Sequence, residues 1–253
     1  MKNIVVLGSG NVAQHLIQAI VTNSNLNLVQ AFARNSENLI SVLPKEKICC
    51  DLQNLAEADV YILAVTDKAI EEITKNLPFK NRLVAHTSGS SSLDIISDKN
   101  RKAVFYPLQT FSKNKAINFK EVPICLEAET TDDLLLLKEI ASILSNSVYE
   151  IDSNQRKSLH VAAVFASNFT NHMYALAEKI CVDNAVDFEI LKPLILETSD
   201  KIKYLSPTEA QTGPAVRKDT QIIATHLNFI PNNDTKEIYK LLTKSIIDHV
   251  QKL

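Results

Sequence analysis

The chain has 253 residues, 45% of them hydrophobic and 22% charged, and its 27 basic and 29 acidic side chains leave a net charge of −2. These values exclude a disordered chain and argue against an electrostatic nucleic-acid partner. Only four glycines occur, whereas an average usage of about 7% would give roughly 18. Each glycine is therefore expected to meet a backbone need, such as a positive φ or a closely approaching ligand.

The first part of the chain alternates strand and helix patterns. Short apolar runs, typical of parallel strands buried on both faces, occur at residues 4–7, 28–33, 60–65, 82–85, 103–106, 123–126 and 148–151. Helical patterns follow some of them, at 12–20, 68–76 and 132–144. This alternation predicts an α/β fold with a doubly wound, mostly parallel sheet.

The character of the chain changes after about Asp152. Long helical patterns cover 154–181, 187–205, 215–229 and 234–252, and Pro193 is expected to bend or begin one of these helices. We therefore predict a Rossmann-like domain at 1–151, followed by an all-helical C-terminal domain at 152–253.

A glycine-rich loop follows the first predicted strand and opens a helix, in the pattern G-x-G-x-x-A. In that setting Gly8 makes the tight turn, Gly10 lets the main chain approach a pyrophosphate, and Ala13 allows close helix–strand packing. The helix N-terminus also offers free N–H groups to phosphates. The alternative is a tight turn without a ligand. We predict a dinucleotide site whose phosphate-binding residues are Gly8, Ser9, Gly10, Asn11 and Val12.

The end of the second strand indicates which dinucleotide binds. NAD-binding versions of this loop carry an acidic residue about 20 positions on, which holds the ribose 2′-hydroxyl. Here the strand ends in Arg34, Asn35 and Ser36. An arginine fork suits a 2′-phosphate, so we favour NADP, as NADPH, over NADH; a solvated loop arginine is the alternative.

Loops at the ends of later strands should face the same ligand, because ligands bind beyond the carboxyl ends of the strands. Val65, Thr66 and Ser88 are predicted cofactor contacts. Asp67 is read either as a helix cap or as a further contact. The segment 86–89 is read either as a capped turn or as the nicotinamide side of the site.

Two further groups are candidates for substrate chemistry at these strand ends. His86 is a candidate acid or base, because histidine ordinarily exchanges protons near neutral pH. Gln109 lies in an aromatic and amide-containing loop that either lines a substrate pocket or only packs as a loop.

The helical part contributes three more candidates. The stretch 159–170 is apolar nearly all round, which predicts a buried helix. This helix nevertheless carries a series of polar groups, with Asn168 one turn before His172. They either satisfy one another internally or face an active cleft. Arg217 is expected in the first turn of a helix, where its charge opposes the dipole and suggests an anionic ligand; a solvated basic turn is the alternative.

At this point the residues resemble a known family. The segments VVLGSGNVAQHL, ILAVTDKAI, VAHTSGSSSL, FYPLQTFSK, LHVAAVFASNFTNHMY and AQTGPAVRKD are similar to those of oxidoreductases that join an NADP-binding Rossmann-like domain to a helical C-terminal domain of unknown function. That family is similar in turn to pyrroline-5-carboxylate reductase, to the 6-phosphogluconate and 3-hydroxyisobutyrate dehydrogenases, and to deazaflavin-dependent NADP oxidoreductases.

The resemblance implies a cofactor at residues 8–12 and 34–36, a cleft between two domains and a homodimer formed through the helical domain. One departure matters. The hydroxyacid dehydrogenases carry a catalytic lysine one turn before an asparagine on the long helix, and the corresponding positions here are Val164 and Ser167. Simple hydroxyacid dehydrogenation is therefore not expected.

The sequence thus predicts an NADP-dependent oxidoreductase acting on a small carbonyl or imine substrate, with a non-catalytic NADP(H)-binding protein as the alternative. Asn168, His172 and His86 are the candidate catalytic residues, and Gln109 and Arg217 the candidate substrate contacts. We expect no metal site, because no zinc-type Cys/His spacing or H-E-x-x-H pattern occurs. The four cysteines lack disulfide-like spacing, which fits the cytoplasm. No membrane or nucleic-acid partner is expected.

Overall fold

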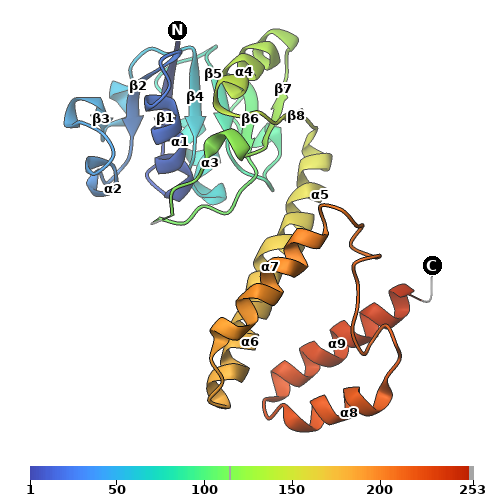
Figure 1. Ribbon diagram of the computed structural model, residues 1–253. Coiled ribbons are helices and arrows are strands. Elements are labelled where there is room, and N and C mark those ends of the chain that lie inside the picture. The colour runs from blue at the N-terminus through green and yellow to red at the C-terminus, as the bar shows by residue number, and fades with distance from the viewer. Residues whose placement is uncertain (114, 251–253) are drawn as a thin grey trace. The chain divides into compact units, whose positions relative to one another are not determined.

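The structure is a computed structural model that describes residues 1–113 and 115–250. Its first part is built on one eight-stranded sheet in the order β3-β2-β1-β4-β5-β6-β7-β8 (Figure 1). The strands are β1 (Lys2–Leu7), β2 (Leu26–Phe32), β3 (Ile48–Cys49), β4 (Val60–Leu63), β5 (Leu83–His86), β6 (Arg101–Pro107), β7 (Ile124–Ala128) and β8 (Val148–Glu150).

The predicted doubly wound, mostly parallel sheet is confirmed. Strands β3 to β6 pair in parallel in the order typical of dinucleotide-binding sheets. Strand β7 runs antiparallel to β6, and β8 runs parallel to β7. Strand β3 was not predicted because its two residues are too few to show a period.

Both faces of the sheet are buried, which explains the continuous apolar runs of its central strands. Ile4 and Val6 of β1 face the core under α1 (Asn11–Val21) and α4 (Thr131–Leu144). Val5 and Leu7 point the other way, into the core under α3 (Asp67–Lys75). Helices on opposite faces of adjacent strands leave the carboxyl ends of β1 and β4 open to a ligand.

The chain divides into two compact units, Met1–Ser167 and Asn168–Leu253. Helix α5 (Ser153–Ala163) leads into a π-helical segment, Val164–Phe169, and the division falls inside that segment. The helices that follow the sheet thus begin at Ser153, whereas the two compact units divide farther along the chain, between Ser167 and Asn168. The domain boundary at 151 stays a prediction.

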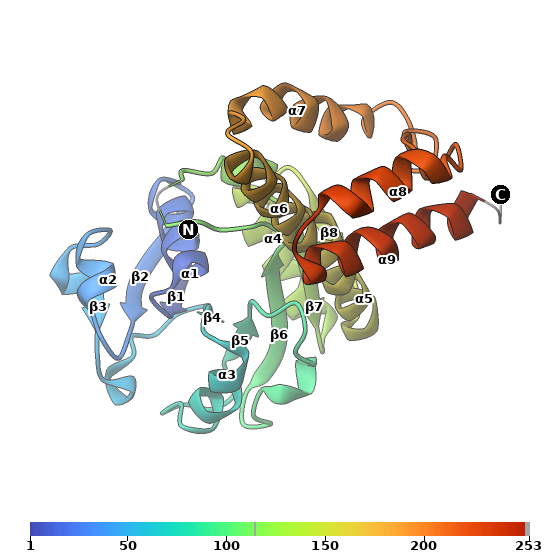
Figure 2. The same cartoon turned by 90° about the horizontal axis from the view of Figure 1, so that it is seen from below.

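The second unit consists of helices. Its elements are α6 (Thr170–Asp183), a 3-10 turn Phe188–Leu191, α7 (Lys192–Lys201), α8 (Thr220–Phe229) and α9 (Asn233–Val250). Pro193 stands in the first turn of α7, where its missing N–H costs nothing. Helices α8 and α9 lie side by side in Figures 1 and 2, and the His226 ring contacts the Tyr239 hydroxyl at 2.9 Å.

Many apolar side chains of the helices remain exposed. Val161 is 54% exposed, although the apolar stretch around it was expected to be buried. Ile190 and Leu194 are 69% and 62% exposed. The expected burial is therefore not achieved within one chain. No helix in the described ranges is both long enough and apolar enough to span a membrane.

Candidate active site

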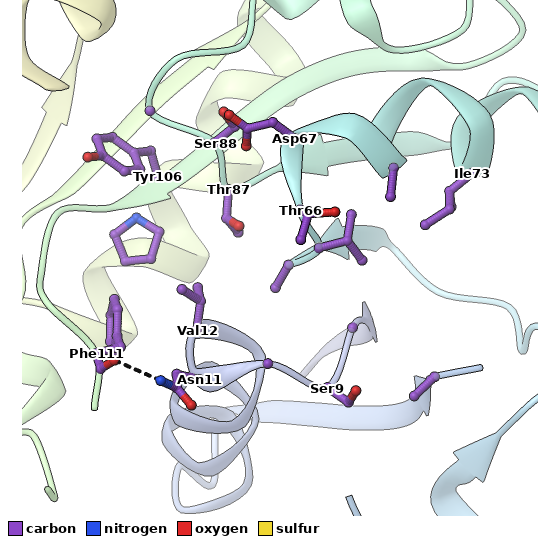
Figure 3. A pocket seen from close by; sticks show the side chains of 18 of the residues that line it. Ser9, Asn11, Val12, Thr66, Asp67, Ile73, Thr87, Ser88, Tyr106 and Phe111 are labelled. Atoms are coloured by element: carbon purple, nitrogen blue, oxygen red, sulfur yellow. Dashed lines mark hydrogen bonds between the residues drawn. The ribbon is translucent and has the colours of Figure 1, made fainter. Parts of the chain in front are cut away.

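A pocket of about 720 Å³ lies within the first unit, beyond the carboxyl ends of the strands. The loops that follow β1, β2, β4, β5 and β6 line it, together with His160 from α5. Figure 3 shows Ser9 and Asn11 from the glycine loop on one side, and Thr87, Ser88 and Tyr106 on another. The volume is in the range of small-molecule and cofactor sites.

The glycine loop forms a cradle at the start of α1. Gly8 has a φ of +137°, and an added Cβ would lie 2.0 Å from the backbone oxygen of Ala64. Gly10 is the N-cap of α1 without a side-chain cap, and a Cβ there would meet nothing within 4 Å. The Gln14 side-chain amide donates to the Ser9 carbonyl at 2.8 Å and holds the loop.

This cradle fits a pyrophosphate. Gly8 serves the turn itself, whereas the space above Gly10 leaves the N–H groups of the first turn of α1 accessible to an anion. All five residues predicted from the motif line the pocket: Gly8, Ser9, Gly10, Asn11 and Val12.

The end of β2 brings Arg34 and Asn35 to the same pocket. Arg34 is exposed, and no carboxylate takes the position after Phe32 that NAD-binding loops use. The side chain of Asn35 exchanges hydrogen bonds with Glu37, accepting from its N–H at 2.9 Å and donating to its carboxylate. Ser36 is not among the pocket-lining residues; it is the N-cap of α2 (Glu37–Ile40).

The loop after β4 contributes Val65, Thr66 and Asp67, and all three line the pocket. Thr66, and not Asp67, is the N-cap of α3, so the helix-cap interpretation of Asp67 is wrong. The Asp67 carboxylate accepts a hydrogen bond from the Ser90 hydroxyl. This bond joins the loops after β4 and β5.

A serine network holds the loop after β5. The Ser88 hydroxyl donates to the Ser91 hydroxyl at 3.0 Å and accepts from the backbone N–H groups of Ser90 and Ser91. Ser88 lines the pocket, and its contact with a cofactor stays a prediction. The capped turn is also present, because the Ser92 side chain accepts from the Asp94 N–H at the start of a 3-10 turn.

His86 lies beneath this loop and does not line the pocket. Its side chain is fully buried, its Nδ1 accepts from the Ser88 N–H at 3.1 Å, and its Nε2 lies 3.3 Å from the Ser92 carbonyl oxygen. Burial, assisted by the charge of Arg156, lowers the pKa of His86 to about 4. The geometry favours a structural role for a neutral imidazole, and the acid–base role of His86 stays a prediction.

The loop after β6 is fixed over the start of α1. Asn11 donates from its side-chain amide to the Phe111 carbonyl at 3.0 Å, the contact dashed in Figure 3. The His15 ring lies 3.0 Å from the Ser112 carbonyl oxygen and packs against the Phe111 ring. Gln109, the predicted substrate contact, lines the pocket from this loop.

Tyr106 and His160 were not among the predicted site residues, yet they line the pocket as a contacting pair. Tyr106 is near the carboxyl end of β6, and its Oη lies 3.1 Å from Nδ1 of His160 on α5. The position of Tyr106 at a strand end was visible in the sequence. Nothing in the sequence paired it with a histidine so far along the chain.

Arg156 is a third residue near this site that the sequence did not predict. It is fully buried, pairs with Glu127 and donates to the Ser91 carbonyl at 2.6 Å and to the Ser153 hydroxyl at 3.1 Å. Its Nε has no hydrogen-bond partner among the residues that the structure describes. The guanidinium thereby ties the serine loop to the start of α5, the helix that carries His160.

The remaining predicted residues belong to the second unit. Asn168 lies in the π-helical segment and His172 on α6, and both are exposed. Arg217 is exposed and precedes α8, which begins at Thr220 and is capped by Asp219. The argument from a misplaced charge in a first helical turn is therefore wrong, and the roles of these three residues stay predictions.

No group of three His, Cys, Asp or Glu side chains within residues 1–113 and 115–250 is arranged to hold a metal ion.

Comparisons with known proteins identify both parts of the chain. Residues 3–88 match a family described as NADP oxidoreductase, coenzyme F420-dependent. Residues 122–246 match DUF2520, a domain of unknown function. No curated protein sequence matches the chain.

Solved structures extend the likeness over the whole chain. A candidate NADP oxidoreductase from Bacteroides fragilis is 39% identical, with a TM-score of 0.88 and 98% of each chain covered. Two more distant structures share the fold. Pyrroline carboxylate reductase from Plasmodium falciparum, solved with NADP bound, has 12% identity and a TM-score of 0.63 over 99% of this chain and 97% of that one. An imine reductase from Myxococcus stipitatus has 11% identity and a TM-score of 0.61 over 100% and 94%.

The resemblance expected from the sequence is confirmed: the chain belongs to the family of oxidoreductases in which a Rossmann-type NADP oxidoreductase domain precedes a helical DUF2520 domain.

Proposed function

We propose that this protein is an NADPH-dependent oxidoreductase that transfers hydride between C4 of a nicotinamide and a small carbonyl or imine substrate. The observation that carries the proposal is a single pocket lined both by an open glycine cradle and by the arginine at the end of β2. Family membership supports the reaction class, and the pyrroline carboxylate and imine reductases among the structural neighbours support a small substrate.

The chain's own residues bind and orient the cofactor. The N–H groups of the α1 N-terminus hold the pyrophosphate above Gly10, and Arg34 pairs with the 2′-phosphate, which makes NADPH the preferred form. Val65, Thr66 and Ser88 line the route toward the nicotinamide end. When bound, the nicotinamide supplies the redox chemistry, and the protein supplies positioning and electrostatics.

Asn168, His172 and Arg217 remain our candidates for orienting the substrate. A π-helical turn such as the one around Asn168 frequently occurs at functional sites, which supports a role beyond packing. The test compares kcat and KM of Asn168→Ala and His172→Ala with the wild type. Unchanged constants in both variants would remove these two residues from the proposal and leave the enzyme class intact.

Calorimetric titration with NADPH and NADH tests the cofactor, and a panel of small ketones, aldehydes and cyclic imines tests turnover. We expect NADPH to bind more tightly than NADH and to be oxidised with at least one panel member. Equal or absent binding of both cofactors refutes the cofactor proposal. NADPH binding without turnover would instead favour a non-catalytic NADP(H)-binding protein; Val164 and Ser167, where hydroxyacid dehydrogenases place a lysine, motivate that alternative.

We further propose that the protein is a homodimer formed through its helical part. The exposed apolar side chains there, including Ile190 and Leu194, support this proposal, because so much apolar surface is unusual on a monomer. All four cysteines are free thiols, which is consistent with the cytoplasm, the location that we propose.

A further inference from the structure

The pocket contains a tyrosine–histidine pair whose polar atoms face each other. Tyr106 is 9% exposed, and its ring meets the His160 ring edge-on, with centroids 6.2 Å apart. A hydrogen bond joins Oη of Tyr106 to Nδ1 of His160, at 3.1 Å. Because both residues line the pocket, a bound substrate can reach the pair.

Gly89 makes room for this pair. A Cβ on Gly89 would lie 2.6 Å from Nδ1 of His160 and 2.8 Å from Oη of Tyr106. Real Cβ atoms do not approach other atoms so closely, so any larger residue would push the two polar atoms aside. Gly89 has no positive φ that would otherwise require glycine. One of only four glycines in the chain is thus used to admit a tyrosine hydroxyl and an imidazole.

We infer that Tyr106 is the proton donor of the reaction, that His160 restores its proton, and that the substrate class is a ketone or aldehyde. This inference rests on the proposed function and deepens it. Reduction of a carbonyl leaves an alkoxide that must gain a proton, whereas hydride addition to an iminium ion gives a neutral amine that needs none. A built-in proton donor is therefore needed for carbonyl reduction and not for iminium reduction.

In the direction of reduction, the substrate gains one hydride and one proton. The carbonyl carbon accepts a hydride from the reduced nicotinamide, and the π electrons of the C=O bond move to oxygen. That oxygen takes the proton of Tyr106 Oη, while Tyr106 takes the proton from Nδ1 of the His160 imidazolium. The products are an alcohol, an oxidised nicotinamide and a neutral His160, which regains its proton from solvent.

Burial and the groups around Tyr106 favour its protonated form before the step. Burial raises the pKa of Tyr106 to about 12, and the Cys125 thiol of β7 and the Asp67 carboxylate of α3 act in the same direction. The Arg156 guanidinium of α5 acts in the opposite direction, with a smaller effect than burial and a larger one than Asp67. The phenol is thus neutral at neutral pH, as a proton donor must be, and imidazole is the side chain best suited to exchange protons there.

The kinetic test uses the full-length protein with NADPH and two probe sets: small ketones and aldehydes, and N-alkyl cyclic iminium ions, which carry no exchangeable proton on nitrogen. We expect Tyr106→Phe to lower kcat for the carbonyl probes by about 10²–10⁴-fold, the usual worth of general acid catalysis. Its Kd for NADPH and its rate with iminium probes should stay within a few-fold of the wild type. Tyr149→Phe, an exposed tyrosine on β8, is the matched control.

His160→Gln tests the second member of the pair. It should lower carbonyl reduction less than Tyr106→Phe does, and it should flatten the pH dependence of kcat, because a glutamine cannot carry the proton. Equal losses with carbonyl and iminium probes in Tyr106→Phe would overturn the donor role. A wild type that reduces iminium probes alone would overturn the carbonyl assignment and leave the proposed function standing.

A measurement without substrate separates the pair from the proposed function. Nitrogen NMR of histidine-labelled protein resolves the six histidines, and His160→Gln assigns the resonance of interest. The Nδ1 signal of His160 should move in Tyr106→Phe and stay in place in Tyr149→Phe. An unmoved signal would show that the hydrogen bond is absent in solution and would overturn the inference. If Tyr106→Phe does move the Nδ1 signal but the wild type reduces none of the probes, the result counts against the proposed function instead.

Discussion

Gly8 and Gly10 stand two positions apart in one loop, and the structure predicts opposite outcomes when each becomes alanine. Gly8 has a φ of +137°, and its missing Cβ would lie 2.0 Å from the Ala64 oxygen and 2.7 Å from the Ala64 carbonyl carbon. Gly10 has a φ of −74°, which any residue adopts, and no atom lies within 4 Å of the missing Cβ. The first glycine is required by the fold, and the second by the ligand.

The cost of Gly8→Ala follows from these numbers. The backbone conformation costs an alanine about 1–3 kcal/mol, and forcing a methyl group against the main chain after β4 costs about 1–3 kcal/mol more. A central value of about 4 kcal/mol lowers Tm by about 8–16 °C in a domain of this size. Gly10→Ala loses only the small N-cap preference for glycine, about 1 kcal/mol or less, so Tm falls by less than about 4 °C.

Cofactor binding should be affected in Gly10→Ala despite its near-normal stability. A methyl group above Gly10 takes the space through which a pyrophosphate reaches the N–H groups of α1. Loss of one charge-assisted hydrogen bond, worth about 1.5–3 kcal/mol, weakens NADPH binding by about 10–150-fold.

Thermal melts without cofactor and fluorescence titration with NADPH measure the two effects separately. A Gly8→Ala protein that melts within 2 °C of the wild type, on the scale of about 2–4 °C per kcal/mol, would refute the packing argument. Wild-type affinity in Gly10→Ala would refute the pyrophosphate assignment.

Three further predictions follow from other parts of the structure. Arg34→Ala should weaken NADPH binding by about 10–150-fold, the worth of one hydrogen bond to a charged group, and leave NADH binding unchanged in calorimetric titrations. The exposed Lys80→Ala is the matched control, and equal losses for both cofactors would remove the 2′-phosphate contact. Burial lowers the pKa of His86 to about 4 in the folded state, so as the pH falls the unfolded state binds a proton at His86 before the folded state does. Urea titrations should therefore show that the wild type loses about 3 kcal/mol more of its free energy of unfolding between pH 7 and pH 4 than His86→Asn does. Equal losses in the two proteins would contradict the burial argument. Leu194→Asp should convert a dimer to monomer in sedimentation experiments, whereas Ile40→Asp, a similarly exposed position on the first unit, should not; a monomeric wild type would end the dimer proposal.

The sheet and the cofactor end of the site were predictable from the sequence because their signals are local. Continuous apolar runs mark buried parallel strands, and the G-x-G-x-x-A pattern marks the loop that follows the first one. The reversal of β7 was not predictable, because a buried strand has the same composition in either direction. The start of α8 was placed too early, since Pro214 marks a turn there and Asp219 supplies the actual cap.

The substrate end of the pocket was less predictable because its contacts join residues distant in sequence. Arg156 on α5 binds the Ser91 carbonyl in the loop after β5, and His160 meets Tyr106 at the end of β6. Neither contact has a periodic signature. A histidine on an apolar helical stretch is as typical of a satisfied core as of an active site, and only the fold brings it to a strand end.

Three of the four glycines in the chain line the pocket, and each of them is required for a different physical reason. Gly8 is required by a positive φ and by the backbone after β4, and Gly10 by the space it leaves open above α1. Gly89 has neither a positive φ nor open space, so its constraint must come from its neighbours, and those neighbours are two polar side chains that line a pocket. A larger residue there would separate Oη from Nδ1 without altering the turn. Gly89→Ala should therefore disturb the Tyr106–His160 hydrogen bond more than it disturbs Tm, and an unmoved Nδ1 resonance in that variant would contradict this account.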